Sequence, residues 1–349
     1  MLKRFFFIFA LILISIEITS CNKEDDWIVN DIVKGDDDIV KEDDNIVDDE
    51  EQDKEVLDAV TEYIAILGDI QYYTNPTYIQ LYKNSVDWIY RQKQLGIHIN
   101  CVLHTGDVTQ GNSINSWQLF YDNTLELASV IPFITMIGDH DYTWDGSLIN
   151  DRQSTRFNDF VSFPLTVNKV VAWFEEGHME NIVVENTIHG QRIDFLILEF
   201  GPRDEVVEWA DKYVKSHPNV KFIMLNHEYL EARGGRRTTG LKCERRIRNS
   251  SYTTPEQLWE KLIKCNDNIL CVLCGHVGGL YAYTEDINDF GRIIPQIQHN
   301  IQGPQYRYDN WLMLWEIPAN EDIVKVSVYN TQSGMFYDNK EVLFDFKLF

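Results

Sequence analysis

A nine-residue stretch decides the fold: Tyr63-Ile64-Ala65-Ile66-Leu67-Gly68-Asp69-Ile70-Gln71. Its first five residues are apolar, as in a buried strand, and a glycine and an aspartate follow directly. Four later apolar runs end in a similar way, on Gly106-Asp107, Gly138-Asp139-His140-Asp141, Asn226-His227 and Gly275-His276. Because ligands bind beyond the carboxyl ends of strands in open α/β sheets, we expect these five strand ends to bring Asp and His to one rim. Such a group of carboxylates and imidazoles suits divalent metal ions.

Apolar runs alternate with helix-period stretches from about residue 59 onward. The runs expected to be strands are Tyr63–Leu67, Cys101–His104, Phe133–Ile137, Ile193–Phe200, Lys221–Leu225 and Ile269–Leu273. One helix is expected around Ile79–Ile89, where apolar residues share a face, and another after Thr254, which opens a capping box. Beyond residue 279 the expected strands are Leu280–Thr284, Ile293–Ile301, Trp311–Ile317, Ile323–Tyr329 and Val342–Phe346. The pattern therefore predicts one α/β domain over residues 59–349, in which two mixed sheets pack together with helices outside.

The composition limits what the chain can be. Of its 349 residues, 44% are apolar and 13% aromatic, which excludes wholesale disorder, collagen and coiled coil. There are 31 basic against 55 acidic residues, a formal net charge of -24. A chain this acidic repels polyanions, so we expect no nucleic-acid polymer as a partner.

Residues 1–21 have the pattern of a lipoprotein signal peptide. Lys3 and Arg4 precede the apolar run Phe5–Ile16, which is too short to span a membrane. The sequence Ile18-Thr19-Ser20-Cys21 then resembles a bacterial lipobox, in which Cys21 is lipidated. The alternative is an ordinary secretory signal with a chance cysteine. We expect contact with the membrane through this N-terminal lipid only, in the bacterial cell envelope.

Residues 22–58 differ from the rest of the chain in composition. They contain 17 acidic residues against four lysines, so like charge and low hydrophobicity predict an acidic, disordered tether. The first five, Asn22-Lys23-Glu24-Asp25-Asp26, resemble the surface-export signal of lipoproteins in one phylum of Gram-negative bacteria. The expected location is therefore the outer membrane, with the domain exposed at the surface.

The five strand-end motifs resemble, in order and spacing, those of the calcineurin-like metallophosphoesterases. That family's pattern is Asp-x-His, Gly-Asp, Gly-Asn-His-(Asp/Glu), His and Gly-His-x-His, and the resemblance spans residues 69–278. It implies a four-layer α/β/β/α sandwich that holds two divalent metal ions (Mn, Mg, Fe or Zn). The implied activity is hydrolysis of a phosphate mono- or diester of a small substrate.

The resemblance also implies a role for each motif residue. Asp107 would bridge both ions, and Asp69 would bind the first. The second ion would be held by Asp139, His227 and His276. A metal-bound hydroxide would attack phosphorus in line, and His140, oriented by Asp141, would protonate the leaving group.

Three positions depart from the family pattern. Gln71 stands in place of a histidine, Asp139 in place of an asparagine, and Gly278 in place of the last histidine. The first site is left with Asp69, Gln71 and Asp107, a weaker, oxygen-only set that favours Mg or Mn.

Several interpretations of these departures stay open. The stretches Asp69–Gln71 and Gly275–Gly279 are similar to a branch of the family that begins Asp-x-Gln and ends Gly-His-Val-Gly-Gly. The candidates for a substitute ligand are His299 and Gln302. The alternative function is a non-catalytic binding protein with a degraded first metal site.

A basic run stands out against the acidic background between Arg233 and Arg248. Within it, Arg236 and Arg237 are candidates for binding substrate phosphate, because guanidinium groups match phosphate oxygens in pairs. The alternative is a solvated charged loop.

Overall fold

The computed structural model describes residues 61–146, 148–161, 169–237, 246–303 and 305–348. Every described residue belongs to one compact unit, which lies within Asp48–Phe349. The predicted signal peptide with Cys21 and the predicted tether lie outside the described residues.

The first sheet is built around three parallel strands, β1 (Glu62–Leu67), β2 (Ile99–His104) and β3 (Phe133–Thr135). Its order is β17-β16-β15-β1-β2-β3, and β18 pairs with β16. The other strands are β15 (Trp311–Ile317), β16 (Ile323–Asn330), β17 (Met335–Phe336) and β18 (Phe344–Lys347). Strand β15 pairs antiparallel with β1, β16 pairs antiparallel with β15, and β17 and β18 pair antiparallel with β16. The parallel arrangement places the carboxyl ends of β1, β2 and β3 at one edge.

The second sheet has the order β13-β14-β12-β10-β9-β7-β6, and β8 pairs with β9. Its four central strands run parallel: β9 (Gln191–Leu198), β10 (Lys221–Asn226), β12 (Ile269–Cys274) and β14 (Ile293–His299). The antiparallel strands are β6 (Val170–Trp173), β7 (Ile182–Val184), β8 (Thr187–Ile188) and β13 (Tyr281–Ile287). A small third sheet consists of β4 (Trp144–Asp145), β5 (Leu148–Ile149) and β11 (Arg246–Ile247).

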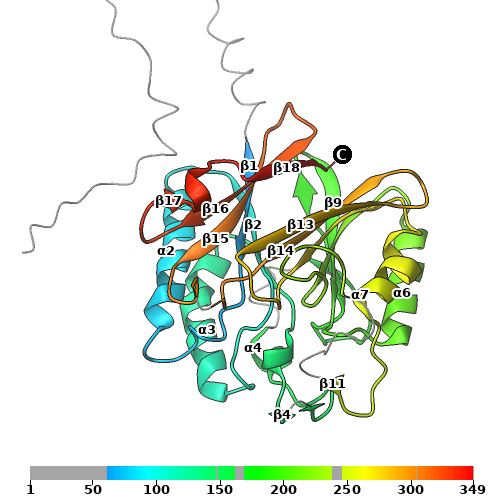
Figure 1. The fold of residues 1–349 in the computed structure, drawn as a ribbon, viewed down its shortest axis with the longest axis horizontal. Helices are drawn as coiled ribbons and strands as arrows, with labels where there is room; N and C mark the ends of the chain where they lie inside the picture. Colours follow the sequence, from blue (N-terminus) through cyan, green and yellow to red (C-terminus); the bar gives the residue numbers. More distant parts are fainter. Residues whose placement is uncertain (1–60, 147, 162–168, 238–245, 304, 349) are drawn as a thin grey trace, which may run out of the picture. The chain divides into compact units, whose positions relative to one another are not determined.

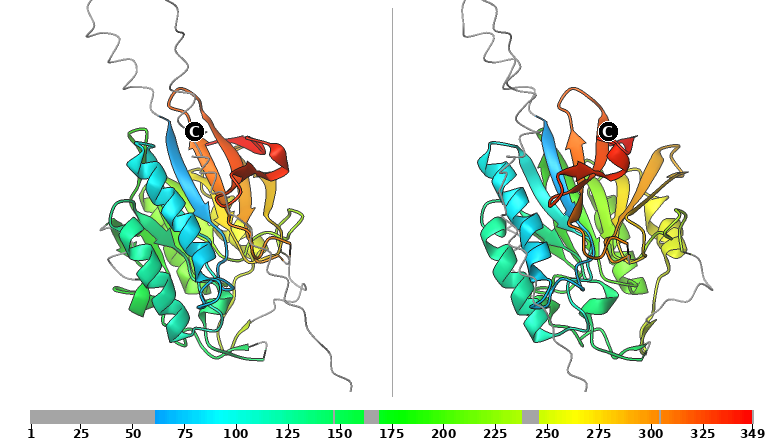
Figure 2. Two further views of the ribbon diagram at one scale, coloured as in Figure 1. Left: turned by 90° about the vertical axis from the view of Figure 1, so that its left-hand side faces the viewer. Right: turned by 60° about the vertical axis from the view of Figure 1, so that its left-hand side comes forward.

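Helices cover the outer faces of the two large sheets (Figures 1 and 2). Helices α2 (Ile79–Gln94) and α3 (Ile114–Ala128) lie on the side of the first sheet. Helix α6 (Asp204–Ser216) and α7 (Pro255–Leu258), which continues into the π-helical turn η2 (Trp259–Ile263), lie on the side of the second. The remaining short helices are α4 (Phe157–Phe160), η1 (Asp139–Asp141) and η3 (Tyr337–Asn339). The layers therefore run helix, sheet, sheet, helix, which confirms the predicted α/β class.

Burial explains why these elements form. The central strands β10 and β12 are buried along nearly their whole length, as expected for strands packed on both faces. Helix α2 buries the predicted face with Tyr82, Val86 and Ile89. At the start of α7, Thr254 Oγ1 accepts from Gln257 N at 3.3 Å and Gln257 Oε1 accepts from Thr254 N at 2.9 Å, so the predicted capping box is confirmed.

Strands end earlier than predicted beside the rim. Strand β3 ends at Thr135 and β14 at His299, two residues before the predicted ends. After β14 the chain turns into the rim, where Asn300 Nδ2 donates to Asp69 Oδ2 at 2.8 Å. Within the described residues, the helices are all too short or too polar to cross a membrane.

Candidate metal centre

The carboxyl ends of five strands meet at one rim, as the motifs predict. Asp69 follows β1, Asp107 follows β2 and Asp139 follows β3, while His227 and His276 follow β10 and β12 of the other sheet. Glycine is needed where these loops approach one another. A Cβ at Gly106, whose φ is +94°, would lie 2.7 Å from His227 Nδ1, and one at Gly138 would overlap Asp107.

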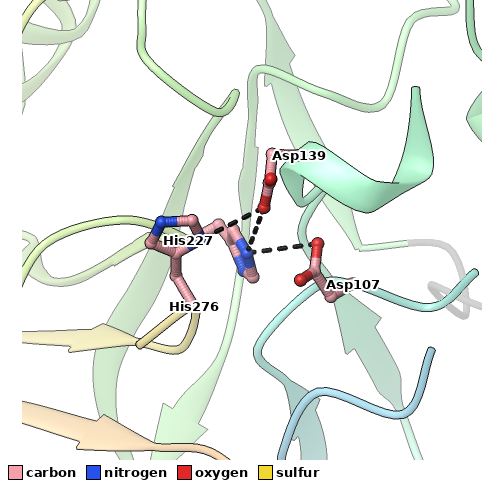
Figure 3. A group of neighbouring side chains, drawn as sticks. All are labelled: Asp107, Asp139, His227 and His276. Carbon is pink, nitrogen blue, oxygen red and sulfur yellow. Dashed lines mark hydrogen bonds and ion pairs between the residues drawn. The ribbon is translucent and has the colours of Figure 1, made fainter. Parts of the chain in front are cut away.

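Four buried side chains form a compact cluster at the centre of this rim: Asp107, Asp139, His227 and His276. Their possible ligand atoms lie within 4.8 Å of one another (Figure 3). His227 Nε2 is 3.2 Å from Asp107 Oδ1 and 3.4 Å from Asp139 Oδ1, and His276 Nδ1 is 3.0 Å from Asp139 Oδ1. The cluster brings together every residue that the resemblance implies for the second ion.

The surroundings of the two imidazoles leave one nitrogen of each facing the carboxylates. His227 Nδ1 lies 2.6 Å from the carbonyl oxygen of Thr105 and donates to it, so Nε2 is the nitrogen available to a cation. His276 Nε2 lies 3.7 Å from Glu228 Oε1, which favours a proton there and leaves Nδ1 for a cation. The donor set of two carboxylates and two imidazoles fits a divalent transition metal.

Charge balance in the cluster points the same way. Burial lowers the pKa of His227, but the Asp107 and Asp69 carboxylates outweigh it and hold the pKa well above the usual range. Burial raises the pKa of Asp139, but His276 and His227 hold it well below the usual range. The buried carboxylates thus require a positive charge beside them, which a divalent cation would also supply.

Amide groups surround the carboxylate expected to bind the first ion. Asp69 Oδ1 accepts from Thr105 Oγ1 at 2.9 Å. Its Oδ2 accepts from His276 N at 2.9 Å, from Asn300 Nδ2 at 2.8 Å and from Gln302 Nε2 at 2.9 Å. Burial raises the pKa of Asp69 to about 7.

Gln71 joins the two expected sites. Its Nε2 donates to Asp107 Oδ2 at 3.2 Å and to Gln302 Oε1 at 3.0 Å. Its Oε1 is buried and has no hydrogen-bond partner among the described residues. The structure therefore brings Asp69, Gln71 and Asp107 together, with Gln302 beside them.

His140 lies next to Asp107, but the structure corrects its predicted pairing with Asp141. The His140 backbone N–H donates to Asp107 Oδ1 at 2.9 Å, and His140 Nε2 is 4.0 Å from Asp107 Oδ2. The side chain that contacts His140 Nδ1 is Gln110, whose Oε1 lies at 2.7 Å. Asp141 instead accepts from the backbone N–H groups of Thr109 at 2.8 Å and Gly138 at 2.9 Å. The Asp141 carboxylate therefore links the two motif loops through their backbone N–H groups.

The two candidate phosphate-binding arginines are also corrected, since both guanidinium groups are paired with carboxylates. Arg236 Nε donates to Glu256 Oε2 at 2.8 Å, its Nη1 pairs with Asp286, and its guanidinium lies over the Trp259 ring. The side chain of Arg236 is only 12% exposed.

Arg237 is held in the same way. Its Nη1 lies 3.0 Å from Glu228 Oε1 and its Nε 3.3 Å from Glu231 Oε1. Both arginines therefore hold the loop after β10 in place. The rest of the basic run, residues 238–245, lies outside the described residues.

Sequence reasoning missed Thr105, Gln110, Glu228 and Asn300, which hold the motif side chains. Only Glu228 had a signal, because it directly follows a candidate ligand. Of the two candidate substitute ligands, His299 Nδ1 lies 2.9 Å from the carbonyl oxygen of Leu280, whereas Gln302 contacts Asp69 and Gln71.

A family model and a curated relative both match most of the domain. The model described as calcineurin-like phosphoesterase matches residues 62–279. The uncharacterized protein YvnB of Bacillus subtilis (strain 168) is 26% identical over 290 residues, which cover 78% of this chain. The chain spans about a fifth of that relative's length, since the match covers 20% of it.

Two solved structures also match this chain at low identity and low TM-score. The 5'-nucleotidase from Candida albicans SC5314 is 12% identical, with a TM-score of 0.43 over 78% of this chain and 52% of its own. A conserved uncharacterized protein of Streptococcus pneumoniae TIGR4, described as a predicted phosphoesterase, is 11% identical, with a TM-score of 0.32. That match covers 82% of this chain and 98% of the other.

Proposed function

The chain belongs to the calcineurin-like phosphoesterase family, and from this we propose that it is a metal-dependent hydrolase of a small phosphate mono- or diester. The observation that carries the proposal is the buried cluster of Asp107, Asp139, His227 and His276 at the strand ends. The fold alone would not specify the chemistry, but four convergent ligand atoms within 4.8 Å of one another suit a divalent ion.

Two divalent ions would complete the site, drawn from Mn, Mg, Fe and Zn. The cluster would hold one, and Asp69, Gln71 and Asp107 would hold the other, with Asp107 shared. When bound, such a pair of ions supplies Lewis acidity and lowers the pKa of a bound water. The oxygen-only donors of the first site favour the harder ions, Mg and Mn.

His140 is suited to protonate the leaving group. With a proton on each ring nitrogen, Nδ1 donates to Gln110 Oε1 at 2.7 Å, and Nε2 carries the transferable proton toward the rim. The backbone bond from His140 to Asp107 at 2.9 Å fixes the ring beside the cluster. Trp144 packs edge-on against the imidazole, with ring centroids 5.3 Å apart, which restricts its rotation further.

For the substrate's negative charge we propose Arg307 in place of Arg236 and Arg237. Its guanidinium lies 3.9 Å from the centroid of the Tyr72 ring, and Tyr72 directly follows Gln71 in the sequence. Its Nε donates to the Gln302 carbonyl at 3.1 Å. Among the described residues no carboxylate pairs with Arg307, so its terminal nitrogens can bind phosphate oxygens.

A non-catalytic binding protein on the same fold is the alternative, and one observation favours it. Both oxygens of Asp69 already accept hydrogen bonds from protein donors, four in all. A panel of aryl phosphomonoesters and diesters, nucleotides, sugar phosphates and phospholipid headgroups, assayed with Mn²⁺ and the full chain, separates the two. Turnover of any ester that Asp107→Asn abolishes supports the enzyme, whereas none in the panel supports the alternative.

We also propose that Cys21 carries a lipid that anchors the chain in the outer membrane, with residues 22–58 as a tether. The lipobox-like sequence and the acidic composition support this. Cys21→Ser should move the protein from the membrane fraction to the soluble fraction. Protease shaving of intact cells should release the domain if it faces outward. Retention of Cys21→Ser in the membrane would contradict the anchor.

A further inference from the structure

The position of the missing histidine is open in this fold. A Cβ at Gly278 would meet no atom within 4 Å, and its backbone is not left-handed. By contrast, a Cβ at the neighbouring Gly275 would lie 2.8 Å from Thr105 Oγ1. The fold thus has space for a side chain at residue 278, but the side chain that contacts Asp69 at the rim comes from Gln302.

Gln302 enters the rim from the loop after β14. Its Nε2 donates to Asp69 Oδ2 at 2.9 Å and to the His276 carbonyl at 2.6 Å, and its Oε1 accepts from Gln71 Nε2 at 3.0 Å. The side chain therefore contacts two of the three residues expected to hold the first ion, Asp69 and Gln71, and the backbone of His276, which is expected to hold the second.

The backbone of Gln302 is held on both sides. Its N–H donates to Asn300 Oδ1 at 2.7 Å, while the same asparagine donates from Nδ2 to Asp69 Oδ2 at 2.8 Å. Its carbonyl accepts from Arg307 Nε at 3.1 Å. These contacts hold the loop in a position that keeps the Gln302 side-chain amide beside Asp69.

A second observation points to a cation at this place. Gln71 is 2% exposed, and its Oε1 has no hydrogen-bond partner among the described residues, although its Nε2 lies 3.2 Å from Asp107 Oδ2. A buried amide oxygen without a donor is costly, and a hard cation satisfies it. Ligation through Gln302 Oε1 requires a half-turn of the amide, which gives up the hydrogen bonds that Nε2 donates to Asp69 and to the His276 carbonyl. A cation bound between these oxygens would offset that loss.

We propose that Gln302 replaces the family's last histidine as a ligand of the first ion, through its Oε1. With Asp69, Gln71 and Asp107 it forms a site of carboxylate and amide oxygens only. Such a donor set prefers Mg²⁺ or Mn²⁺ to Zn²⁺. The inference rests on the proposed two-ion function and adds the ligand that the motif lacks.

The test is metal binding to the stripped full chain, measured by titration calorimetry and by Mn²⁺ electron paramagnetic resonance. The wild type should show a tight and a weaker class of site. Gln302→Ala should weaken the weaker class about 10- to 100-fold and leave the tight class unchanged. Gln302→Glu, which keeps an oxygen donor, should retain both classes. Gln305→Ala, an exposed glutamine in the same loop, is the matched control.

A rescue variant makes the test specific. In Gln302→Ala with Gly278→His, the open space at residue 278 admits an imidazole, which should restore the weaker class and shift its preference toward Zn²⁺. Two unchanged classes in Gln302→Ala would overturn the inference and leave the two-ion function standing. A wild type with one class of site would overturn both.

Discussion

Replacing Gly106 by alanine should damage the metal centre through His227, and the size of the effect follows from two distances. The new Cβ would lie 2.7 Å from His227 Nδ1, whereas ordinary contact begins at 3.4 Å, so the ring or the loop must yield by about 0.7 Å. The ring cannot move without weakening the 2.6 Å hydrogen bond from Nδ1 to the Thr105 carbonyl. A shift of this size at a ligand is expected to weaken metal binding about 10- to 100-fold and to lower turnover by a similar factor.

A positive backbone angle adds a second cost, and the chain offers a variant that isolates it. Gly106 has φ +94° and Gly96 has φ +90°, but a Cβ at Gly96 would meet nothing within 4 Å. The unfolding free energy of Gly96→Ala should therefore fall by about 1–2 kcal/mol, because alanine is strained in a left-handed backbone, and its metal binding and turnover should be unchanged. Gly106→Ala should lose a further ~1–3 kcal/mol from the overlap.

The assays are thermal unfolding, metal titration of the stripped chain and turnover of an aryl phosphate with Mn²⁺. If Gly106→Ala and Gly96→Ala lose equal stability and both keep full metal affinity, the steric reasoning about His227 is refuted. Loss of metal binding in Gly106→Ala alone would support it.

Three further outcomes are expected. Asp107→Asn should abolish turnover and weaken both classes of metal site, whereas His140→Asn should slow turnover with metal content intact, as elemental analysis of the two purified variants would reveal. Arg307→Ala should raise KM about tenfold or more, which corresponds to the loss of one charge-assisted hydrogen bond. Arg236→Ala should instead lower the melting temperature and leave the KM of the folded protein unchanged. The reverse pattern would restore Arg236 as the residue that binds the substrate. Burial lowers the pKa of His104 to about 3, whereas in the unfolded chain it is near 6.5, so the unfolded chain binds the proton first as pH falls. The free energy of unfolding should therefore fall by about 2 kcal/mol between pH 7 and pH 5. The reference variant is His104→Asn, which keeps an acceptor for the Gly106 N–H and should not show this fall. If urea unfolding shows the same change in unfolding free energy between pH 7 and pH 5 for the wild type and for His104→Asn, that assignment is contradicted.

The four residues of the buried cluster could be predicted because a local pattern marks each one. His227 and His276 directly follow apolar runs that form β10 and β12, and parallel strands place such residues at one edge. The same holds for Asp107 and Asp139 in the other sheet. The local pattern of apolar residues also predicts the alternation of strands and helices, and this alternation predicts the layers of helix and sheet.

Contacts between distant segments could not be predicted in this way. Gln302 lies 233 positions from Asp69, and no spacing rule links a residue in an irregular loop to its partner. Strand β14 ends at His299 because Asn300 bonds to Asp69, which is a tertiary contact.

The basic run misled for the same physical reason. A cluster of arginines in an acidic chain favours phosphate binding only if no carboxylate of the same chain pairs with those arginines. Glu256 and Asp286, which both lie outside the run, neutralise Arg236. Likewise Asp141 adjoins His140 in sequence, yet its carboxylate turns to backbone N–H groups, and Gln110 takes the expected place.

Phosphate release by the metal-stripped full chain, titrated with Mn²⁺, tests the central claim most directly. An aryl phosphomonoester and the corresponding diester serve as substrates, and Asp139→Asn, which removes one charge from the cluster, is measured in parallel. No hydrolysis is expected without metal, and turnover of at least one ester should appear as the weaker class of site fills, at a higher Mn²⁺ concentration in Asp139→Asn. Hydrolysis at the same rate with and without metal would contradict a metal-dependent phosphoesterase. So would the absence of hydrolysis when both classes of metal site are filled.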